Sequence, residues 1–336
     1  MSLGIMAIGY ALGTPVPLDE LAANGITDDA KVRQWGYRRL HRAPEETGLT
    51  DLAVRAGETA LRRAGVEADE VDLVILAITD IAEYLYWDAA AAVTGRLDAR
   101  HAEAMLLSQA CGSGVAAFDV VAGKFATHPR YRTALVIAAN RIAESYWDRV
   151  ETSTSLSSDG AAAAVLRRDH PSCRWLATEV VTDGRYADFM RMEAGGAAHP
   201  FTGAERPAIP PLIDRMDTFF DGNGGAALAF VDQLHARNRD VVERACASAD
   251  VAIGSIERVL YLHDNGGAFA DLAKALGIPL DRTNLEIARD HGHFGPADQL
   301  LSLERLLATG ELVTGDTVAL LSMGTGMHWA CTLLRI

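Results

Sequence analysis

Residues 104–118 read Ala-Met-Leu-Leu-Ser-Gln-Ala-Cys-Gly-Ser-Gly-Val-Ala-Ala-Phe, and the interpretation of the whole chain starts from this stretch. An apolar run ends at Cys111, and a Gly- and Ala-rich pattern typical of a helix begins directly after it. The pattern predicts that Cys111 lies on the turn between a buried strand and a helix. The free N–H groups and the positive dipole end of a helix N-terminus favour the thiolate, which is the reactive form of cysteine. Alternatively, Cys111 is a buried structural cysteine, as free cysteines often are.

The composition of the 336-residue chain is that of a globular protein with a sizeable core, since 49% of the residues are hydrophobic and 23% are charged. The length suggests roughly two domains. A net charge of -14 argues against nucleic acid as a partner. The sequence contains no uninterrupted apolar stretch of about 20 residues, and its first residues lack the basic region of a secretory signal, so neither a membrane span nor secretion is expected.

The chain has 4 cysteines, and none of them forms a Cys-x-x-Cys pair. They are Cys111, Cys173, Cys246 and Cys331. Their wide spacing indicates neither a zinc site nor a disulfide framework, so no metal is expected. A reducing, cytoplasmic location is therefore expected.

The first half of the sequence alternates between strand and helix patterns. Residues 50–64 have the apolar spacing of an amphipathic helix, and residues 71–78 form a continuous apolar run typical of a strand buried on both faces. Further strands are expected at 4–10, 134–139 and 159–166, and further helices at 85–96 and from Cys111 to about residue 126. This alternation predicts an α/β protein with a mostly parallel sheet.

The second half repeats this order, so we expect two similar halves, 1–168 carrying Cys111 and 169–336 carrying the candidate histidines. Strands are expected at 258–263, 284–288, 317–322 and 328–334, and helices at 226–248, 268–276 and 296–309. Residues 18–49 are expected to be an irregular connection. Residues 184–211 are rich in Gly, Ala and Pro and predict a long loop that forms a lid or a pocket wall.

Several motifs in this order resemble the thiolase superfamily, specifically its β-ketoacyl-acyl-carrier-protein synthase III branch. They are the cysteine turn 109–114, Asp-Gly-Ala-Ala at 159–162, His263 after a strand, the His-Gly-His turn at 291–293, and Met-Gly-Thr-Gly-Met-His-Trp at 323–329. The resemblance covers essentially the whole chain. It implies a five-layered αβαβα fold, usually a homodimer, that acts on acyl thioesters of coenzyme A or acyl carrier protein. It also implies that Cys111 is a nucleophile and that no separate cofactor is needed.

The chain departs from the family where the other catalytic residues are expected. The family triad is Cys, His and Asn, and His263 matches the family histidine. The asparagine, however, lies in a Gly-Asn-Thr turn that is Gly-His293-Phe here, and Asp298 stands five residues later. Two neutral donors suit the enolate of a decarboxylative condensation. A histidine oriented by a carboxylate instead suits a general base that activates Cys111 and then an acceptor hydroxyl.

A Cys–His–Asp set resembles a subgroup of antibiotic-pathway acyltransferases that move acyl groups, including malonyl, onto sugar hydroxyls. We therefore expect an acyltransferase of secondary metabolism with Cys111, His293, Asp298 and His263 as catalytic residues, and a hydroxyl or amine acceptor. One alternative is decarboxylative carbon–carbon condensation by Cys111, His263 and His293. Another alternative is a non-catalytic protein with a thiolase fold.

The sequence also predicts further site residues. The backbone N–H groups of Cys111, Thr325 and Gly326 would hold the thioester oxygen, and His199 is a candidate pocket residue. His291 would replace His293 if the alignment slips by two residues. The family tryptophan that stacks on the adenine of coenzyme A corresponds to Ala30, which favours a carrier-protein donor. The candidate contacts with its acidic surface or its pantetheine phosphate are Arg33, Arg38, Arg39 and Arg42.

Overall fold

The computed structural model describes residues 2–21, 23, 29–79, 81–203 and 209–336. Within these residues one sheet has the strand order β5-β4-β6-β7-β1-β8-β11-β10-β9, and β2 and β3 form a separate pair. The first half contributes β1 (Leu3–Leu12), β4 (Leu73–Ile78), β5 (Glu103–Leu107), β6 (Thr133–Asn140) and β7 (Gly160–Arg168). The second half contributes β8 (Arg174–Thr182), β9 (Ile256–Leu260), β10 (Thr317–Gly324) and β11 (His328–Arg335).

The sheet is mixed, which corrects the expectation of a mostly parallel one. In the described residues, β4 runs parallel to β5 and β6, and β9 runs parallel to β10, whereas the other pairings are antiparallel. The reason is that β6 leads to β7, and β10 to β11, without a crossover helix, and strands joined in this way pair antiparallel. The two sets of strands meet where Gly4 of β1 pairs with Arg174 of β8.

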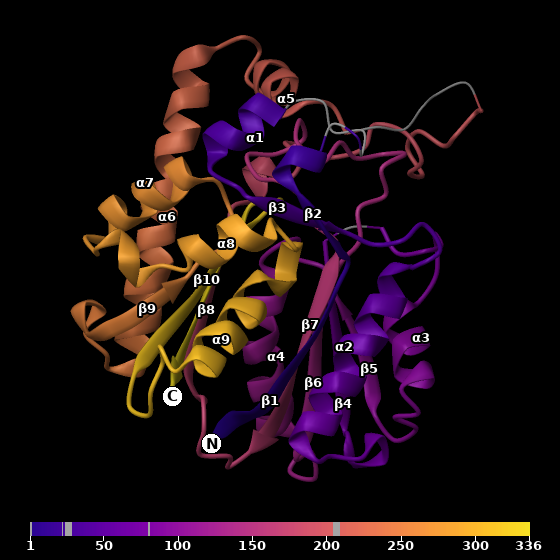
Figure 1. Cartoon of the computed structure of the whole chain (residues 1–336), viewed down its shortest axis with the longest axis vertical. Helices are drawn as coiled ribbons and strands as arrows, with labels where there is room; N and C mark the ends of the chain where they lie inside the picture. Colours follow the sequence, from indigo (N-terminus) through magenta and orange to yellow (C-terminus); the bar gives the residue numbers. More distant parts are fainter. Residues whose placement is uncertain (1, 22, 24–28, 80, 204–208) are drawn as a thin grey trace.

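The helices form three layers around the two sets of strands (Figure 1). One outer layer consists of α2 (Leu49–Ala64) and α3 (Ala89–Arg96), and the other of α6 (Gly224–Ala249) and α7 (Gly266–Leu276). Between them, α4 (Ser113–Thr127) and α9 (Asp298–Thr309) contact strands of both sets. This arrangement confirms the predicted five-layered αβαβα fold of the thiolase type.

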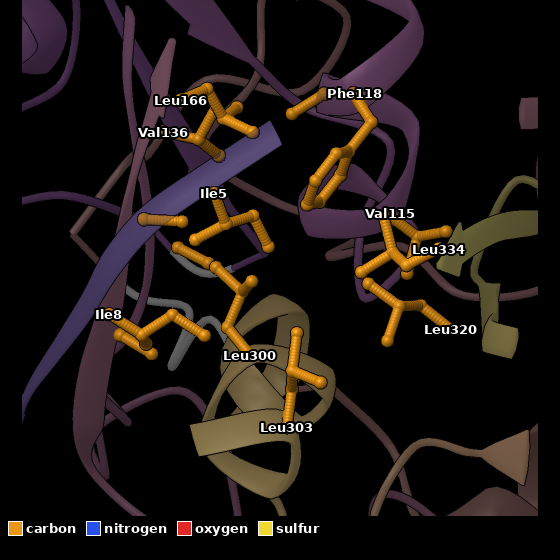
Figure 2. Packing of buried hydrophobic residues seen from close by; sticks show 14 of the residues in the cluster. Ile5, Ile8, Val115, Phe118, Val136, Leu166, Leu300, Leu303, Leu320 and Leu334 are labelled. Carbon is orange, nitrogen blue, oxygen red and sulfur yellow. The ribbon is translucent and has the colours of Figure 1, made fainter. Parts of the chain in front are cut away.

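The core around α4 and α9 joins the two halves (Figure 2). Phe118 of α4 and Leu300 of α9 are buried together with Ile5 of β1, Val136 of β6 and Leu320 of β10. A buried aromatic or aliphatic side chain of this size contributes about 1.5–3 kcal/mol through removal of apolar surface from water. This shared core therefore fixes the N-terminus of α4 relative to the N-terminus of α9.

Two sequence-based expectations were wrong in their local structure. Residues 284–288 do not form a strand, because Leu285 and Ala288 are buried at helical spacing in α8 (Leu285–His291). Residues 18–49 are not simply irregular, because they contain α1 (Asp29–Trp35) and β3 (Arg39–Arg42), which pairs with β2 (Thr14–Pro17). Within that segment, residues 22 and 24–28 lie outside the described part of the chain.

The predicted loop 184–211 contains only a short 3-10 helix in its described part, and residues 204–208 lie outside that part. It leads into α5 (Leu212–Phe219). The short 3-10 helices are η1 (Leu18–Glu20), η3 (Ala68–Glu70), η4 (Gly184–Tyr186), η5 (Ile253–Ser255), η6 (Leu280–Arg282) and η7 (Gly295–Ala297). None of the helices in the described residues has the length and apolar character required to span a bilayer.

Candidate active site

Cys111 lies on a tight turn between β5 and α4. The preceding residue, Ala110, has a φ of 49, which is uncommon for a residue with a Cβ. The N–H of Gly112 donates to the Gln109 carbonyl at 3.1 Å, and the N–H of Ser113 donates to the Ala110 carbonyl at 3.0 Å. The turn therefore presents Cys111 two residues before Ser113, the first residue of α4, so Cys111 lies between a strand and a helix as the sequence predicted.

Cys111 is also the most accessible of the four cysteines. It is partly exposed, whereas the other three are buried. Burial raises the pKa of Cys173 to about 11 and also raises the pKa of Cys246 and Cys331. Because a thiol must ionise to act as a nucleophile, these three side chains are expected to be unreactive in the folded protein.

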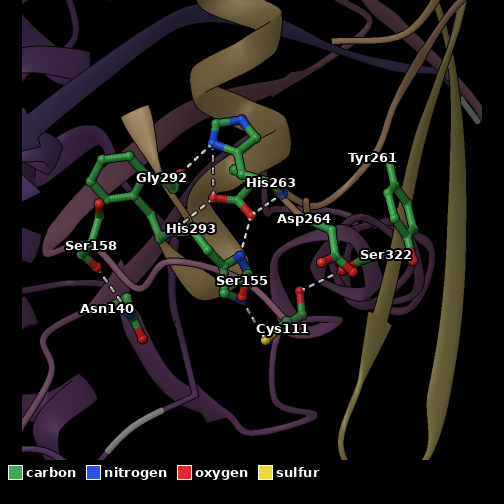
Figure 3. A network of polar contacts seen from close by, with 12 residues as sticks. Cys111, Asn140, Ser155, Ser158, Tyr261, His263, Asp264, Gly292, His293 and Ser322 are labelled. Carbon is green, nitrogen blue, oxygen red and sulfur yellow. Dashed lines mark hydrogen bonds and ion pairs between the residues drawn. The ribbon is translucent and has the colours of Figure 1, made fainter. Parts of the chain in front are cut away.

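The structure brings Cys111, His293 and Asp298 together at the meeting point of the two halves. Figure 3 shows Cys111 beside His293. Nε2 of His293 lies 3.3 Å from Sγ of Cys111, and Nδ1 of His293 lies 2.6 Å from Oδ2 of Asp298. Asp298 is fully buried, and His293 is 9% exposed. The side chains thus form a linear array of thiol, imidazole and carboxylate, in which the carboxylate fixes the imidazole with Nε2 facing the thiol.

The main chain of residues 156–158 holds His293 from the other side. The N–H of His293 donates to the Leu156 carbonyl, and the N–H of Ser158 donates to the His293 carbonyl, each at 2.8 Å. Gly292, which precedes His293, has a φ of 70 and a ψ of -172. A Cβ on Gly292 would lie 2.4 Å from Oγ of Ser158 and 2.9 Å from the Leu156 carbonyl oxygen. Only glycine fits this position without a rearrangement of the turn that aims His293.

Asp298 is the first residue of α9 and accepts several hydrogen bonds in the core. Oδ2 accepts from the N–H of His263 at 2.6 Å and from His293, and Oδ1 accepts from the N–H of Phe294 at 2.7 Å. Burial opposes ionisation of this carboxyl, but the neighbouring imidazoles and these donors outweigh it, so the pKa of Asp298 is lowered. Asp298 is therefore an anion in the folded protein at neutral pH.

The charge on Asp298 also affects the pKa of His293. Burial by itself would lower the pKa of His293, but the Asp298 carboxylate, the neighbouring Cys111 and hydrogen bonds to both raise it well above its usual value. His293 is thus a strong proton acceptor for a group beside Cys111. The raised pKa favours transfer of the Cys111 proton to Nε2, which is the step that activates the thiol.

Within the described residues, the His263 side chain forms no hydrogen bond with Cys111, so its position gives no support to the predicted catalytic role. Its side chain is fully buried, with Nδ1 2.7 Å from the Gly292 carbonyl and Nε2 2.8 Å from Oγ of Ser302. Burial, opposed only in part by the charge of Asp298, lowers the pKa of His263. Both ring nitrogens are occupied inside the core, so His263 supports Asp298 and Gly292 rather than contacting a substrate.

The other two histidines singled out in the sequence lie away from the thiol. His291 stacks on His41 with ring centroids 5.4 Å apart, and its Nδ1 lies 2.9 Å from the Ile287 carbonyl. Burial is the main cause that lowers the pKa of His291 to about 4. His199 is exposed, and its carbonyl accepts from the N–H of Gly195 at 2.8 Å. The position of His199 gives no support to the predicted role in the pocket.

The β10–β11 turn packs directly on the Cys111 turn. A Cβ on Gly324 would lie 2.5 Å from the Gln109 carbonyl oxygen and 3.0 Å from the Gly112 nitrogen. Oγ of Ser322 donates to the Cys111 carbonyl at 2.8 Å. Thr325 and Gly326 follow directly, so the predicted oxyanion donors lie on the loop that contacts the Cys111 turn.

The four predicted arginines all form ion pairs within the chain. Arg33 pairs with Asp19 at 2.9 Å, and Arg42 pairs with Glu144 at 2.5 Å. Arg38 pairs with Glu286 and with Asp290, and Arg39 lies 3.9 Å from Asp290. These side chains are 35–48% exposed, so they remain accessible, but they do not form an uncompensated basic patch.

Sequence reasoning missed Thr79, Asn284 and Ser302. Oγ1 of Thr79 lies 3.8 Å from Sγ of Cys111. The signal for Thr79 was present, because it directly follows an apolar strand whose carboxyl end lies beside that of the strand before Cys111. Asn284 and Ser302 carried no such signal, because their side chains act inside the core.

Asp264 directly follows His263 in the sequence, and its side chain is also buried. It is 5% exposed, and its Oδ1 accepts from the N–H of Asn265 at 2.8 Å. Burial raises the pKa of this carboxyl. Its side chain is drawn beside the Cys111–His293 network in Figure 3.

A cavity of about 770 Å³ opens at the carboxyl-end side of β4 and β6. It is lined by residues from 42–49, 81–83 and 141–146. Cys111 is not among its lining residues, so this cavity is not the space directly around the Cys111 thiol. Among the described residues, no group of three or more His, Cys, Asp or Glu side chains is arranged to hold a metal ion.

Comparison with known proteins identifies the family. Residues 106–184 match the family model described as 3-oxoacyl-[acyl-carrier-protein] synthase III, and residues 246–336 match the model of its C-terminal part. The chain is 30% identical over 325 residues to the β-ketoacyl-[acyl-carrier-protein] synthase III of Paramagnetospirillum magneticum. The aligned region covers 94% of this chain and 93% of that protein. The chain belongs to the synthase III family of the thiolase superfamily. The matched segments contain Cys111, His263, His293 and Asp298.

Other relatives agree with this family membership. The synthase III of Acaryochloris marina is 28% identical over 346 residues, covering 98% of each chain. Among solved structures, the acyltransferase ChlB3 superposes with a TM-score of 0.88 at 26% identity, covering 100% of this chain and 98% of ChlB3. The synthase III of Pseudomonas aeruginosa superposes with a TM-score of 0.81 at 25% identity, with the same coverage. The family is enzymatic and includes both synthases and an acyltransferase.

Proposed function

We propose that this protein is an acyltransferase that carries an acyl group on Cys111 from a thioester donor to a hydroxyl or amine acceptor. The observation that carries the proposal is the array of Cys111, His293 and Asp298, with contacts of 3.3 and 2.6 Å. A nucleophile, a base and a carboxylate in line are the components of acyl transfer in unrelated enzymes.

In the first half-reaction, Nε2 of His293 accepts the proton of the Cys111 thiol as Sγ attacks the carbonyl carbon of the thioester. The thioester oxygen becomes negatively charged, and the backbone N–H groups of Cys111 and Gly326 are the proposed donors to it. The intermediate collapses with cleavage of the bond between carbon and the donor sulfur. The donor thiol leaves with the proton from His293, and the acyl group stays on Sγ.

In the second half-reaction, His293 accepts the proton of the acceptor hydroxyl or amine, and the acceptor atom attacks the acyl carbon. Collapse breaks the bond between carbon and Sγ and restores the Cys111 thiol with the proton from His293. The Asp298 carboxylate stabilises the imidazolium in both halves, which is why its lowered pKa supports this scheme. No bond to a carboxyl group is broken, so a malonyl donor would keep its carboxylate.

The donor and the assembly are part of the proposal. Ala30 in place of the family tryptophan favours an acyl carrier protein over coenzyme A, and the accessible arginines 33, 38, 39 and 42 are available to exchange partners with acidic groups. A homodimer is supported by the position of β5 at the edge of the sheet and by the exposed side chains of Tyr84, Leu85 and Tyr86. A role in secondary metabolism, with malonyl as one candidate group, rests on the resemblance to antibiotic-pathway acyltransferases.

The second candidate function is decarboxylative condensation, and it is considered because the relatives compared above are named β-ketoacyl-[acyl-carrier-protein] synthase III. That reaction needs two neutral donors for the enolate oxygen. Here His293 is paired with a buried carboxylate, and both ring nitrogens of His263 are occupied in the core. These contacts favour transfer over condensation.

One experiment separates these functions. The protein is incubated with malonyl and simple acyl thioesters, with and without a panel of hydroxyl and amine acceptors. Mass spectrometry follows the Cys111 peptide and the products, and released carbon dioxide is measured. Acylation of Cys111 without carbon dioxide, followed by an ester or amide product, supports the transferase. Carbon dioxide with a β-ketoacyl product supports the synthase, and the absence of acylation contradicts both.

A further inference from the structure

The side chains of Asn284, Ser302 and His263 form a row of hydrogen bonds behind the Cys111–His293–Asp298 array. Asn284 directly precedes α8, Ser302 lies in α9, and His263 lies shortly before α7. Nδ2 of Asn284 lies 2.9 Å from Oγ of Ser302, and Oγ of Ser302 lies 2.8 Å from Nε2 of His263. The residues are between 0% and 2% exposed. Buried polar groups of this kind must be fully paired, so the direction of each hydrogen bond can be worked out.

The main chain fixes the orientation of the Asn284 amide. The N–H of Tyr261 can only donate, and it lies 2.8 Å from the amide oxygen of Asn284. The carbonyl of Tyr261 can only accept, and it lies 2.8 Å from Nδ2. One amide hydrogen of Asn284 thus points to Tyr261, and the other points to Oγ of Ser302.

The proton positions on His263 follow from its partners. The Gly292 carbonyl can only accept, so Nδ1 of His263 carries a proton. A second proton on Nε2 would make a fully buried cation. Nδ1 also lies 3.4 Å from Oδ1 of Asp298, whose charge favours that cation, but the effect of burial is larger and lowers the pKa of His263. Nε2 is therefore unprotonated and accepts the single hydroxyl proton of Ser302, whose oxygen already accepts from Asn284.

We propose that Asn284 and Ser302 are positioning residues that lock His263 as a neutral imidazole protonated on Nδ1. Locked in this way, His263 holds the Gly292 carbonyl through its ring and Oδ2 of Asp298 through its peptide N–H. Both contacts converge on His293, one through the turn that precedes it and one through its carboxylate partner. This inference rests on the proposed function only in assigning catalysis to the Cys111–His293 pair.

The locked state also restricts the chemistry. With Nε2 unprotonated and turned toward Ser302, His263 cannot donate a hydrogen bond to a thioester or enolate oxygen. The chain therefore lacks one donor that a condensation would need, and the row from Asn284 to His263 is the physical cause of that loss.

The protonation state of His263 is measured directly in the wild-type protein without substrate. The protein is labelled with ¹⁵N in the histidine rings, and the His263 signals are assigned by their loss in His263→Gln. We expect Nδ1 to be protonated and Nε2 to be unprotonated from mildly acidic to mildly alkaline pH. A proton on Nε2, in either the other tautomer or a cation, would overturn the inference.

The positioning role is tested with Ser302→Ala, which removes the donor to Nε2. We expect the rate of Cys111 alkylation by iodoacetamide to fall about tenfold, and its pH dependence to shift, because His293 is held less firmly. Thr94→Val is the matched control, since it removes a buried hydroxyl whose bond to the Ala90 carbonyl lies within α3. Alkylation in Ser302→Ala with the wild-type rate and pH dependence would contradict the proposal.

The outcomes are independent of the proposed function. Failure of Cys111 to accept an acyl group would remove the transferase assignment, whereas the ring signals of His263 are recorded without any donor. If Ser302→Ala does not fold, the wild-type ring signals still decide whether His263 is locked as inferred.

Discussion

Asp298 and His293 are five residues apart in the sequence, and η7 folds the chain between them so that Oδ2 and Nδ1 lie 2.6 Å apart. The contact places a negative charge at the N-terminus of α9, where the helix dipole favours it, and directs it at the imidazole beside Cys111. The Asp298 carboxylate therefore stabilises the N-terminus of α9 and also orients His293, the proposed base.

The first prediction concerns the charge of Asp298. Asp298→Asn keeps the shape but removes the anion, so His293 loses both its orientation and the stabilisation of its imidazolium. We expect kcat for acyl transfer to fall about 10³-fold. The control is Glu58→Gln, which removes a carboxylate from the exposed side of α2. Transfer by Asp298→Asn at a rate within a factor of two of the wild type would contradict the proposed role.

The second prediction concerns stability at low pH. The pKa of Asp298 is lowered in the folded state, so its stabilising effect is present above the unfolded pKa of about 3.9 and is lost as the pH falls through the folded value. Chemical unfolding of the wild type and Asp298→Asn is measured over a series of pH values. The free energies of unfolding should converge as the pH is lowered, and a constant difference would argue against this effect.

The third prediction has the opposite sign and concerns His293. Its folded pKa is raised, so its contribution is complete below the unfolded pKa of about 6.5 and is lost as the pH rises through the folded value. The difference in unfolding free energy between the wild type and His293→Gln should therefore shrink as the pH increases. A difference that grows with pH would show that the pKa of His293 is lowered instead.

The fourth prediction concerns Gly292. Gly292→Ala places a Cβ 2.4 Å from Oγ of Ser158 at a φ of 70, so we expect a loss of about 2–4 kcal/mol in unfolding free energy and a displaced His293. Gly123→Ala is the control, because Gly123 lies within α4 with no atom within 4 Å of its added Cβ. That change should stabilise the protein by about 0.5–1 kcal/mol. Equal effects of the two substitutions would contradict the close packing of the turn.

The fifth prediction concerns thiol reactivity. Brief treatment with iodoacetamide should modify Cys111 and leave the three buried cysteines intact, as measured by peptide mass spectrometry. His293→Ala should slow this reaction, because the thiol loses its proton acceptor. Modification of Cys246 or Cys331 before Cys111 would show that the accessibility of these side chains differs from that described.

The sequence predicted several residues of the site but not the buried hydrogen bonds that connect them. Cys111 was identified from the local change from apolar run to helix, and His293 and Asp298 were identified from their place in a family pattern. The side-chain direction of His263 was not predictable, because it depends on Ser302 and Asn284, which lie in other elements. The structure of residues 284–288 was misjudged, because a short apolar run has no periodicity that separates a strand from one turn of helix.

By itself, the sequence determined the turn at Cys111, the alternation of strands and helices, and the residue types needed for an acyl-transfer array. These features depend on local spacing and on the identity of side chains, which are properties of short segments. Only the tertiary structure decided that β6 and β7 run antiparallel, that Cys111 and His293 meet across the two halves, and that His263 is turned into the core. Those outcomes depend on the packing of α4 and α9 between the two sets of strands, which brings together residues more than 180 positions apart.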